Sequence, residues 1–332
     1  MKLKNSITDV PGIEVGHAQN DEALTGCTVV LCRKGAVAGV DVRGGAPGTR
    51  ETDLLDPINL VEKIHAVMLA GGSAYGLDAA SGAMRYLEEQ RIGFFTGAAR
   101  VPIVPSAILY DLSVGRADIR PDADMGYQAC VNASRRAMVE GNAGAGTGAS
   151  VGKILGQKQA MKSGIGSASI SIGRGLVVGA TAAVNAFGDV IDPASGMIVA
   201  GARSARVGPM NIGAPGYFVD TIRLMKSMVG QTVMNFATRA NTLLGVVAVN
   251  ASLTKTEMKK VAQMAQDGIA RAIRPAHTML DGDIVFALAT GGGKADVSTT
   301  GAFAAEALTL SILRAVYMAS PVGGLPGLHM KK

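Results

Sequence analysis

Asn241-Thr242 joins an irregular stretch of chain to an abrupt apolar run, and this junction is where the sequence could do chemistry. A hydroxyl nucleophile needs a base. The α-amino group of the same residue can serve, since its ordinary pKa near 7.7 to 8.0 leaves part of it neutral at physiological pH. A threonine gains a free α-amine only when the peptide bond before it is cut. The junction is thus compatible with a nucleophile that cleavage would create, although many strands simply begin with threonine.

Two aspartates form a second candidate group. In Asp281-Gly-Asp283 the carboxylates are two residues apart, so an extended chain would place both on one face. An Asp-Gly pair is also typical of a hairpin turn, and the sequence leaves that alternative open.

A glycine-rich segment ending in Lys153 invites comparison with a phosphate-binding loop. Such a loop requires glycine where this chain has Thr147, and serine or threonine where it has Ile154. No better nucleotide-binding pattern occurs elsewhere, and we expect no organic cofactor.

Metal binding and disulfides are not indicated either. The cysteines and histidines lack the paired spacings of zinc or disulfide frameworks, so we expect buried thiols and structural or surface imidazoles: Cys27, Cys32, Cys130, His17, His65, His277 and His329.

Composition excludes several other classes. Aromatic residues make up 4% of the chain and Trp is absent, so a base-stacking surface for nucleic acid is not expected. The net charge is +6. Residues after 241 contribute +3, from nine Lys and Arg and six Asp and Glu, and residues up to 241 contribute the other +3, from 23 and 20. The positive charge is therefore spread along the chain and does not indicate a surface for nucleic acid. The start lacks an apolar leader and no apolar run is long enough for a membrane helix, which predicts a cytoplasmic protein without a membrane partner.

The elements that must hold these groups read as α/β layers in the first half. We expect neighbouring strands at 27–32 and 36–42 and a buried strand at 66–70. A Gly-Gly-Ser turn should then lead into a helix over 74–90.

The second half reads differently. Small and β-branched residues from 163 to 199 predict antiparallel strands and hairpins, and 203–240 predicts an irregular surface connection. A strand should begin at Thr242, followed by a helix from the capping box at 254–257 to about 273, a strand at 284–289 and a last helix at 302–318. No repeat or domain boundary is evident.

Taken together, several motifs resemble the DmpA-type aminopeptidase/esterase family, and within it the branch of nylon-oligomer (6-aminohexanoate oligomer) hydrolases. They run collinearly over nearly the whole chain: Thr8-Asp-Val-Pro-Gly-Ile-Glu-Val-Gly-His17, Val42-Arg-Gly-Gly-Ala46, Leu69-Ala-Gly-Gly-Ser-Ala-Tyr-Gly76, the GAGTGAS loop, Asn241-Thr242 and Asp281-Gly-Asp283. The resemblance implies an N-terminal-nucleophile hydrolase with a four-layer αββα sandwich. It also implies a single domain that cuts itself into chains 1–241 and 242–332, which stay together.

The same resemblance implies roles by position. Thr242 would be the nucleophile and Asn241 the residue before the cut. Lys153 would favour the free amine through its charge, Asn185 would donate to an oxyanion, and Tyr110 would line the pocket. Read without the resemblance, these three are a surface lysine, a turn amide and a half-buried phenol.

The aspartates complete the implied site. Asp281 and Asp283 would hold the hydroxyl and amine of Thr242 in register. The aminopeptidase branch tends to have serine as nucleophile and Ser-x-Glu at the acidic pair, and this chain departs from it at both places.

The expected function is hydrolysis of amide bonds in small peptides or ω-amino-acid oligomers through a threonine acyl-enzyme, without metal or cofactor. Relatives usually form tetramers, so a homo-oligomer is implied. The alternatives are an aminopeptidase/D-esterase or β-aminopeptidase of the same family, an acyltransferase of the ornithine acetyltransferase type, and a binding relative that stays uncut.

Overall fold

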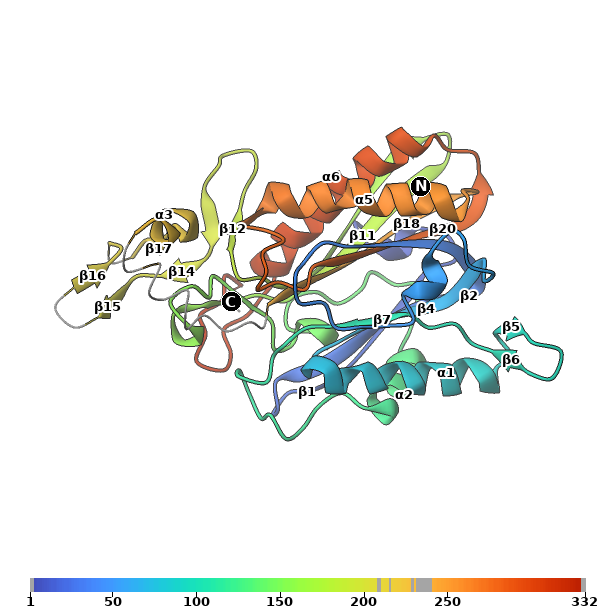
Figure 1. Cartoon of the computed structure of the whole chain (residues 1–332), viewed down its shortest axis with the longest axis horizontal. Coiled ribbons are helices and arrows are strands. Elements are labelled where there is room, and N and C mark those ends of the chain that lie inside the picture. Colours follow the sequence, from blue (N-terminus) through green and yellow to red (C-terminus); the bar gives the residue numbers. More distant parts are fainter. Residues whose placement is uncertain (1–2, 208–209, 215, 228–229, 231–240, 330–332) are drawn as a thin grey trace.

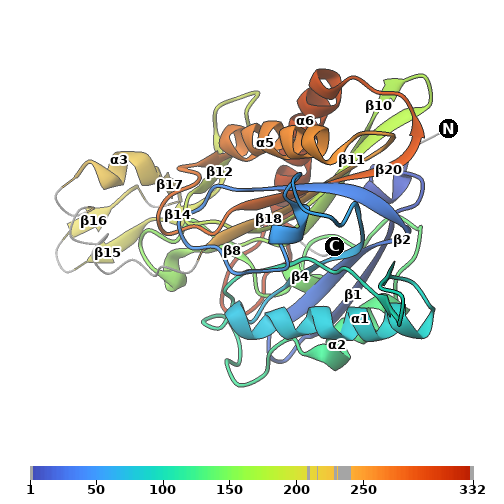
Figure 2. The same ribbon diagram turned by 45° about the vertical axis from the view of Figure 1, so that its right-hand side comes forward.

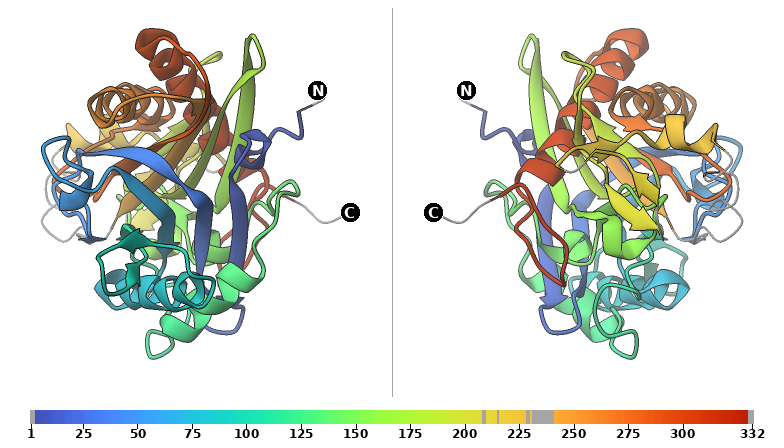
Figure 3. Two further views of the ribbon diagram at one scale, coloured as in Figure 1. Left: turned by 90° about the vertical axis from the view of Figure 1, so that its right-hand side faces the viewer. Right: turned by 90° about the vertical axis from the view of Figure 1, so that its left-hand side faces the viewer.

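The structure is a computed structural model that describes residues 3–207, 210–214, 216–227, 230 and 241–329. Two helical layers enclose two layers of strands (Figure 3). Helices α5 (Lys255–Ala272) and α6 (Val297–Tyr317) form one outer layer, and α1 (Ala79–Glu89) and α2 (Ala123–Val131) form the other (Figure 1). The predicted α/β class and αββα order are confirmed.

The strands of the two inner layers belong to one hydrogen-bonded sheet of nine strands in the described chain, ordered β10-β11-β18-β20-β2-β4-β7-β3 with β1 paired to β2. Their bounds are β10 (Ile165–Gly173), β11 (Leu176–Asn185), β18 (Thr242–Ala251), β20 (Ile284–Gly293), β2 (Thr25–Val42), β4 (Lys63–Ala70), β7 (Ser106–Ile108), β3 (Thr49–Arg50) and β1 (Glu14–Asn20).

Strand β2 connects the two layers. Its residues from Val37 pair with β20 in one layer, while Cys27 to Leu31 pair with β4 in the other. The prediction of two neighbouring strands here was wrong, because the chain runs through as one long strand. The pairing with β4 shifts register between Leu31 and Ala36, so the residues between the two predicted strands, which include Gly35 (φ 77°), form a bulge.

Alternation along β18 divides the core. Its odd-numbered residues pack toward α5 and α6, and its even-numbered residues face the other layer of strands: Leu243, Val247 and Val249 against Leu244, Val246 and Ala248. A third hydrophobic cluster lies between strands β2 and β4 and helices α1 and α2. Small residues let the two helices of one layer approach closely, as at Gly268 on α5, where a Cβ would lie 2.3 Å from the carbonyl oxygen of Ala305 on α6.

The remaining predicted elements are found with shifted ends. Helix α5 has the predicted capping box, formed by Thr254 and Glu257. Helix α6 begins at Val297, earlier than predicted, because Asp296 caps it. The predicted helix at 74–90 starts as a 3-10 helix (Ser73–Asp78) and becomes α-helical only at Ala79. The three cysteines are buried and free, as predicted.

Short elements complete the described chain. The 3-10 turns lie at Ile7–Asp9, Asp53–Leu55, Gly144–Gly146 and Gln157–Gln159. Small sheets are formed by β12 (Asp189–Ile191), β13 (Ile198–Ala200) and β19 (Ile273–Arg274), by β5 (Phe94–Phe95) and β6 (Arg100–Val101), and by β8 (Ser150–Val151) and β9 (Met161–Lys162).

Part of the segment predicted as an irregular connection forms a small lobe at one end of the sandwich (Figure 2). It holds β14 (Ala202–Arg203), β15 (Ala205–Val207), β16 (Met210–Ile212), β17 (Phe218–Val219) and α3 (Thr221–Met225), and the rest of the predicted segment lies outside the described residues. Within the described chain, no helix has both the length and the apolar character that crossing a bilayer requires.

Candidate active site

Three strand ends meet at the junction singled out in the sequence. Thr242 opens β18 in the middle of the large sheet and is the register partner of Asn185, the last residue of β11. Asn241 forms a parallel bridge with Asp281, three residues before β20 starts. Burial is nearly complete, since Thr242 is 4% exposed and Asn185 is 0% exposed. The sheet order therefore brings together residues that are far apart in the chain.

The bond between Asn241 and Thr242 lies at the centre of this cluster. The Thr242 hydroxyl donates to the carbonyl oxygen of Asn241 at 2.5 Å, and the main-chain N–H of Gly282 donates to the same oxygen at 2.8 Å. The main-chain N–H and the side-chain amide of Asn241 both donate to the carbonyl of Leu280, each at 3.2 Å. The threonine hydroxyl thus lies directly against the carbonyl group that precedes it.

Asn185 links the strand end to Lys153. Its Oδ1 accepts hydrogen bonds from Lys153 Nζ at 2.6 Å and from the N–H of Ser150 at 3.1 Å, and its carbonyl accepts from Lys153 Nζ at 3.0 Å. Its Nδ2 donates to the carbonyl of Tyr110 at 2.9 Å. Tyr110 therefore joins the cluster through its main chain, and in the continuous chain the Asn185 amide N–H that we expected to serve an oxyanion is bound to that carbonyl.

The Lys153 side chain lies where burial destabilises its charged ammonium form. The side chain is buried, and burial lowers the pKa of Lys153 to about 7, against the opposing attraction of Asp281 and Asp111. A lysine with this pKa is partly neutral near physiological pH, so it can change charge during a reaction. The surface position that the residue type alone suggests is not what the fold provides.

The two aspartates are held by a loop from 277 to 283. Asp281 accepts from the hydroxyl of Thr278 at 2.5 Å and from the N–H of Phe187 at 3.1 Å. Burial and the neighbouring carboxylate of Asp283 raise the pKa of Asp281 above its ordinary value. The Asp281 carboxyl group is thereby tied to the end of the β11 strand region.

Asp283 is held from both sides. Its Oδ1 accepts from the N–H of Leu243 at 2.8 Å, and its Oδ2 accepts from the N–H of His277 at 3.0 Å. His277 Nδ1 lies 2.9 Å from the same Oδ2. In the continuous chain the Asp283 carboxylate therefore binds the main chain of Leu243, the residue after Thr242. The prediction had placed this carboxylate against the Thr242 hydroxyl, one residue earlier on the strand.

The motif Val42-Arg-Gly-Gly-Ala46 braces this loop. The N–H groups of Arg43 and Ala46 donate to the carbonyls of Asp283 and Asp281, at 3.0 and 2.9 Å. A Cβ on Gly44 would lie 2.3 Å from both the Asp281 oxygen and the Asp283 nitrogen, so only glycine fits. The resemblance in this motif thus corresponds to a physical contact with the acidic pair.

Sequence reasoning missed three polar residues of the site. His277 was expected to be structural or at the surface, and Thr278 and Lys162 were not considered. Lys162 is fully buried, and its Nζ donates to the carbonyls of Gly146, at 3.0 Å, Ala149, at 2.9 Å, and Ser163.

Lys162 belongs to the candidate site because of its position on β9. It lies on β9 opposite Ser150, whose N–H binds Asn185. Burial, opposed by the charge of Asp111 and assisted by that of Lys153, lowers the pKa of Lys162 to about 7. The sequence around it, Ala160-Met-Lys-Ser-Gly164, has no alternating pattern that would have marked a buried lysine.

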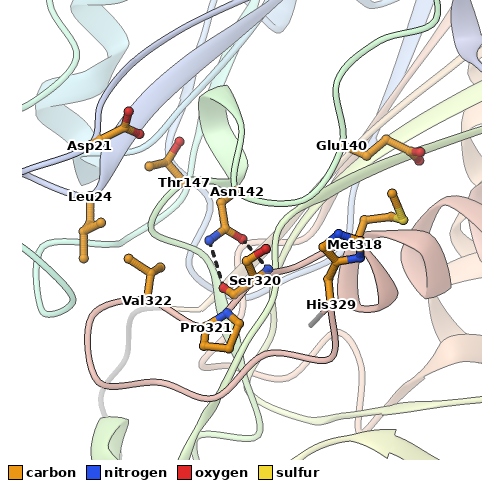
Figure 4. A pocket seen from close by; sticks show the side chains of 10 residues that line it. All are labelled: Asp21, Leu24, Glu140, Asn142, Thr147, Met318, Ser320, Pro321, Val322 and His329. Carbon is orange, nitrogen blue, oxygen red and sulfur yellow. Dashed lines mark hydrogen bonds between the residues drawn. The ribbon is translucent and has the colours of Figure 1, made fainter. Parts of the chain in front are cut away.

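One cavity among the described residues lies apart from the cluster. It has a volume of about 720 Å³ and lies beside the last part of the chain (Figure 4), where its lining is Asp21, Leu24, Glu140, Asn142, Thr147, Met318, Ser320, Pro321, Val322 and His329. No group of three His, Cys, Asp or Glu side chains in the described chain is arranged to hold a metal ion. The candidate site itself is a closed, packed cluster.

The architecture resembles the Ntn hydrolase fold. The structure is similar to the Burkholderia sp. beta-aminopeptidase, with a TM-score of 0.69 at 21% identity over 98% of this chain and 91% of that one. It is also similar to the L-aminopeptidase D-Ala-esterase/amidase of Ochrobactrum anthropi, described as a variant of the Ntn hydrolase fold, with a TM-score of 0.68 at 19% identity over 95% and 86% of the two chains.

The sequence defines the family within this class. The chain belongs to peptidase family S58, whose model matches residues 5–330, and the resemblance stated above is confirmed. An uncharacterized aminopeptidase of Mycobacterium tuberculosis is 45% identical over 97% of this chain and 96% of its own length. A 6-aminohexanoate-oligomer endohydrolase of Kocuria sp. is 32% identical over 88% and 76%. The protein is therefore a hydrolase of a peptidase family.

Proposed function

We propose that this chain is an amidase that cuts its own backbone between Asn241 and Thr242 and then uses Thr242 as its nucleophile. The observation that carries the proposal is the contact of the Thr242 hydroxyl with the Asn241 carbonyl at 2.5 Å, at the first residue of a central strand. The two chains would be 1–241 and 242–332.

Self-cleavage supplies the base for later turnover. The Thr242 hydroxyl attacks the Asn241 carbonyl, the peptide C–N bond breaks, and the hydroxyl proton passes to the departing nitrogen. The resulting ester is hydrolysed by water, which leaves a free amine and a free hydroxyl on the same residue. In turnover the amine accepts the hydroxyl proton as a substrate amide is attacked, and it then activates water against the acyl-enzyme.

The charged groups have defined tasks in this proposal. Asp281 and Asp283 lie next to the new ammonium group and position it. Lys153 adds positive charge beside them, which favours the neutral amine over the ammonium form. Asn185 is the register partner of Thr242, and its amide N–H becomes an oxyanion donor if cleavage frees it from the Tyr110 carbonyl.

The proposed substrates are amides of small peptides or of ω-amino acids. The relatives named above support this range, since they are described as aminopeptidases and as a 6-aminohexanoate-oligomer endohydrolase. We expect the cut pairs to assemble further into a homo-oligomer, which light scattering on the purified protein tests.

A denaturing gel combined with N-terminal sequencing tests the proposal. We expect a smaller band that begins Thr-Leu-Leu-Gly, and we expect Thr242→Ala to abolish both that band and amide hydrolysis. Thr242→Ser keeps a hydroxyl and should cut more slowly. Active protein that remains a single intact chain would refute the mechanism.

Substrate range is tested on the cut protein. Aminoacyl anilides and 6-aminohexanoate oligomers are offered in parallel, with and without an added amine. Release of free acid supports an amidase, whereas transfer of the acyl group to the amine indicates an acyltransferase.

A further inference from the structure

The carbonyl oxygen of Asn241 has two donors in the continuous chain, and only one of them can remain during cleavage. Thr242 Oγ1 donates at 2.5 Å and the N–H of Gly282 donates at 2.8 Å. When the threonine oxygen attacks the carbonyl carbon, it becomes bonded to that carbon and its own hydrogen bond to the oxygen is lost. The Gly282 N–H still points at the oxygen on which negative charge develops.

The identity of residue 282 follows from this approach. A Cβ at this position would lie 2.5 Å from the Ala46 carbonyl oxygen and 2.8 Å from Thr242 Oγ1. Any side chain would therefore push the amide away from the Asn241 carbonyl or displace the nucleophile. The glycine between the two aspartates is required by the cut site itself.

The amide of Gly282 is also held rigidly. The residues on either side of it have their carbonyls bound by Ala46 and Arg43, and the side chain of Asp283 is bound by Leu243. A donor fixed in advance stabilises a developing oxyanion without reorganising during the reaction. Its 2.8 Å distance is within the range expected of such donors.

We propose that the main-chain N–H of Gly282 is the oxyanion donor for self-cleavage. The inference rests on the proposed function. The Oγ–C bond forms, the carbonyl electron pair moves to the oxygen facing Gly282, and collapse of this intermediate breaks the C–N bond while the hydroxyl proton goes to the nitrogen. Loss of one oxyanion donor slows comparable reactions by roughly 10²- to 10³-fold.

The test replaces the amide without adding bulk. Cell-free translation with glycolic acid at position 282 exchanges the N–H for an ester oxygen, which removes the donor and makes the Asp281 carbonyl a weaker acceptor for the Ala46 N–H. The matched control carries glycolic acid at Gly126, a buried glycine of α2 whose N–H donates to the Asp122 carbonyl at 3.0 Å away from the cluster. The unmodified chain is made in the same system, and the cut fraction is followed by denaturing gel.

We expect the position 282 ester to slow cleavage at least 100-fold and the position 126 ester to change it less than threefold. Thermal unfolding midpoints of both esters are measured, so that slow cleavage is compared between equally folded chains. Cleavage of the 282 ester at the unmodified rate, or equal slowing in both esters, overturns the inference. An unmodified chain that never cuts overturns the proposed function as well, which distinguishes the two failures.

Discussion

Asn185 and Thr242 are register partners at the ends of two neighbouring antiparallel strands, and the Asn185 side chain connects that strand end to Lys153 at 2.6 Å. The amide oxygen that accepts from Lys153 is neutral. The pairing of Asn185 with Thr242 therefore places a neutral side chain beside Lys153. Substitution of Asn185 by aspartate would place a negative charge there in a side chain of nearly the same shape.

The first prediction concerns Asn185→Asp. A carboxylate in this place favours the ammonium form of Lys153, so its pKa rises above about 7. The pH at which self-cleavage or turnover changes with Lys153 charge should then move upward by at least one unit, and turnover should slow roughly 100-fold because the N–H donor is missing. Rate against pH from 5 to 10 measures both.

Asn132→Asp is the matched control, because it adds the same charge at an exposed position. It should leave the pH profile in place. An unshifted profile in Asn185→Asp would contradict the assigned contact between the two side chains.

The second prediction concerns Asp283→Ala. Removal of this carboxylate leaves the N–H of Leu243 and both donors of His277 without their acceptor. Buried donors that lose a charged acceptor cost stability, and we expect a loss of about 3 kcal/mol or more in the free energy of unfolding. Urea unfolding measures it, and Thr242→Ala serves as the background so that every chain is uncut.

Asp192→Ala provides the comparison, since Asp192 accepts similar turn hydrogen bonds at the surface. Its effect should be much smaller. Equal losses in the two variants would show that Asp283 does not organise the start of β18.

The third prediction uses pH to detect the buried charge of Lys162. An unfolded lysine stays protonated to about pH 10.5, whereas burial lowers the pKa of Lys162 to about 7. Between these values unfolding takes up a proton, so rising pH stabilises the fold by about 1.4 kcal/mol per unit for this group. Lys162→Met should lose that slope. Urea unfolding at pH 7, 8 and 9 gives the slopes directly.

Lys34→Met removes an exposed lysine and should retain the full slope. A Lys162→Met variant with the same slope as the parent would mean that Lys162 keeps an ordinary pKa in the fold.

The fourth prediction concerns Gly44→Ala. The added Cβ would lie 2.3 Å from main-chain atoms of the loop that carries both aspartates, so that loop has to move. We expect self-cleavage to slow at least tenfold. The control is Gly245→Ala, where the nearest atoms at 3.2 and 3.3 Å belong to side chains that can yield. If both variants cut equally fast, the brace between the two loops is dispensable.

The sequence allowed prediction of features that depend on local pattern. The start of β18 was visible because an apolar, β-branched run begins abruptly at Thr242, and α5 was visible from its capping box. The continuity of β2 was not predicted, because Lys34 and Gly35 are as compatible with a break between two strands as with a bulge in one strand.

The side-chain partners were beyond local pattern. Lys153 meets Asn185 across 32 residues only because β8 and β11 lie near each other, and His277 meets Asp283 because its main chain adopts the left-handed region, with φ at 57°. The resemblance to a family pointed to Lys153 and Asn185 but carried no information on His277 or Lys162. Which polar and charged side chains form hydrogen bonds with each other depends on the packing of elements that are far apart in the sequence.

The strand order has one further consequence for a chain severed before Thr242. Strands β18 and β20 of the short piece lie side by side, with β11 on one flank and β2 on the other, and both flanking strands belong to the long piece. Departure of the short piece would require both ladders to break at once and two of the hydrophobic clusters to open. A chain cut at this point would therefore remain one folded body, and we expect its two pieces to dissociate no more readily than the fold unfolds.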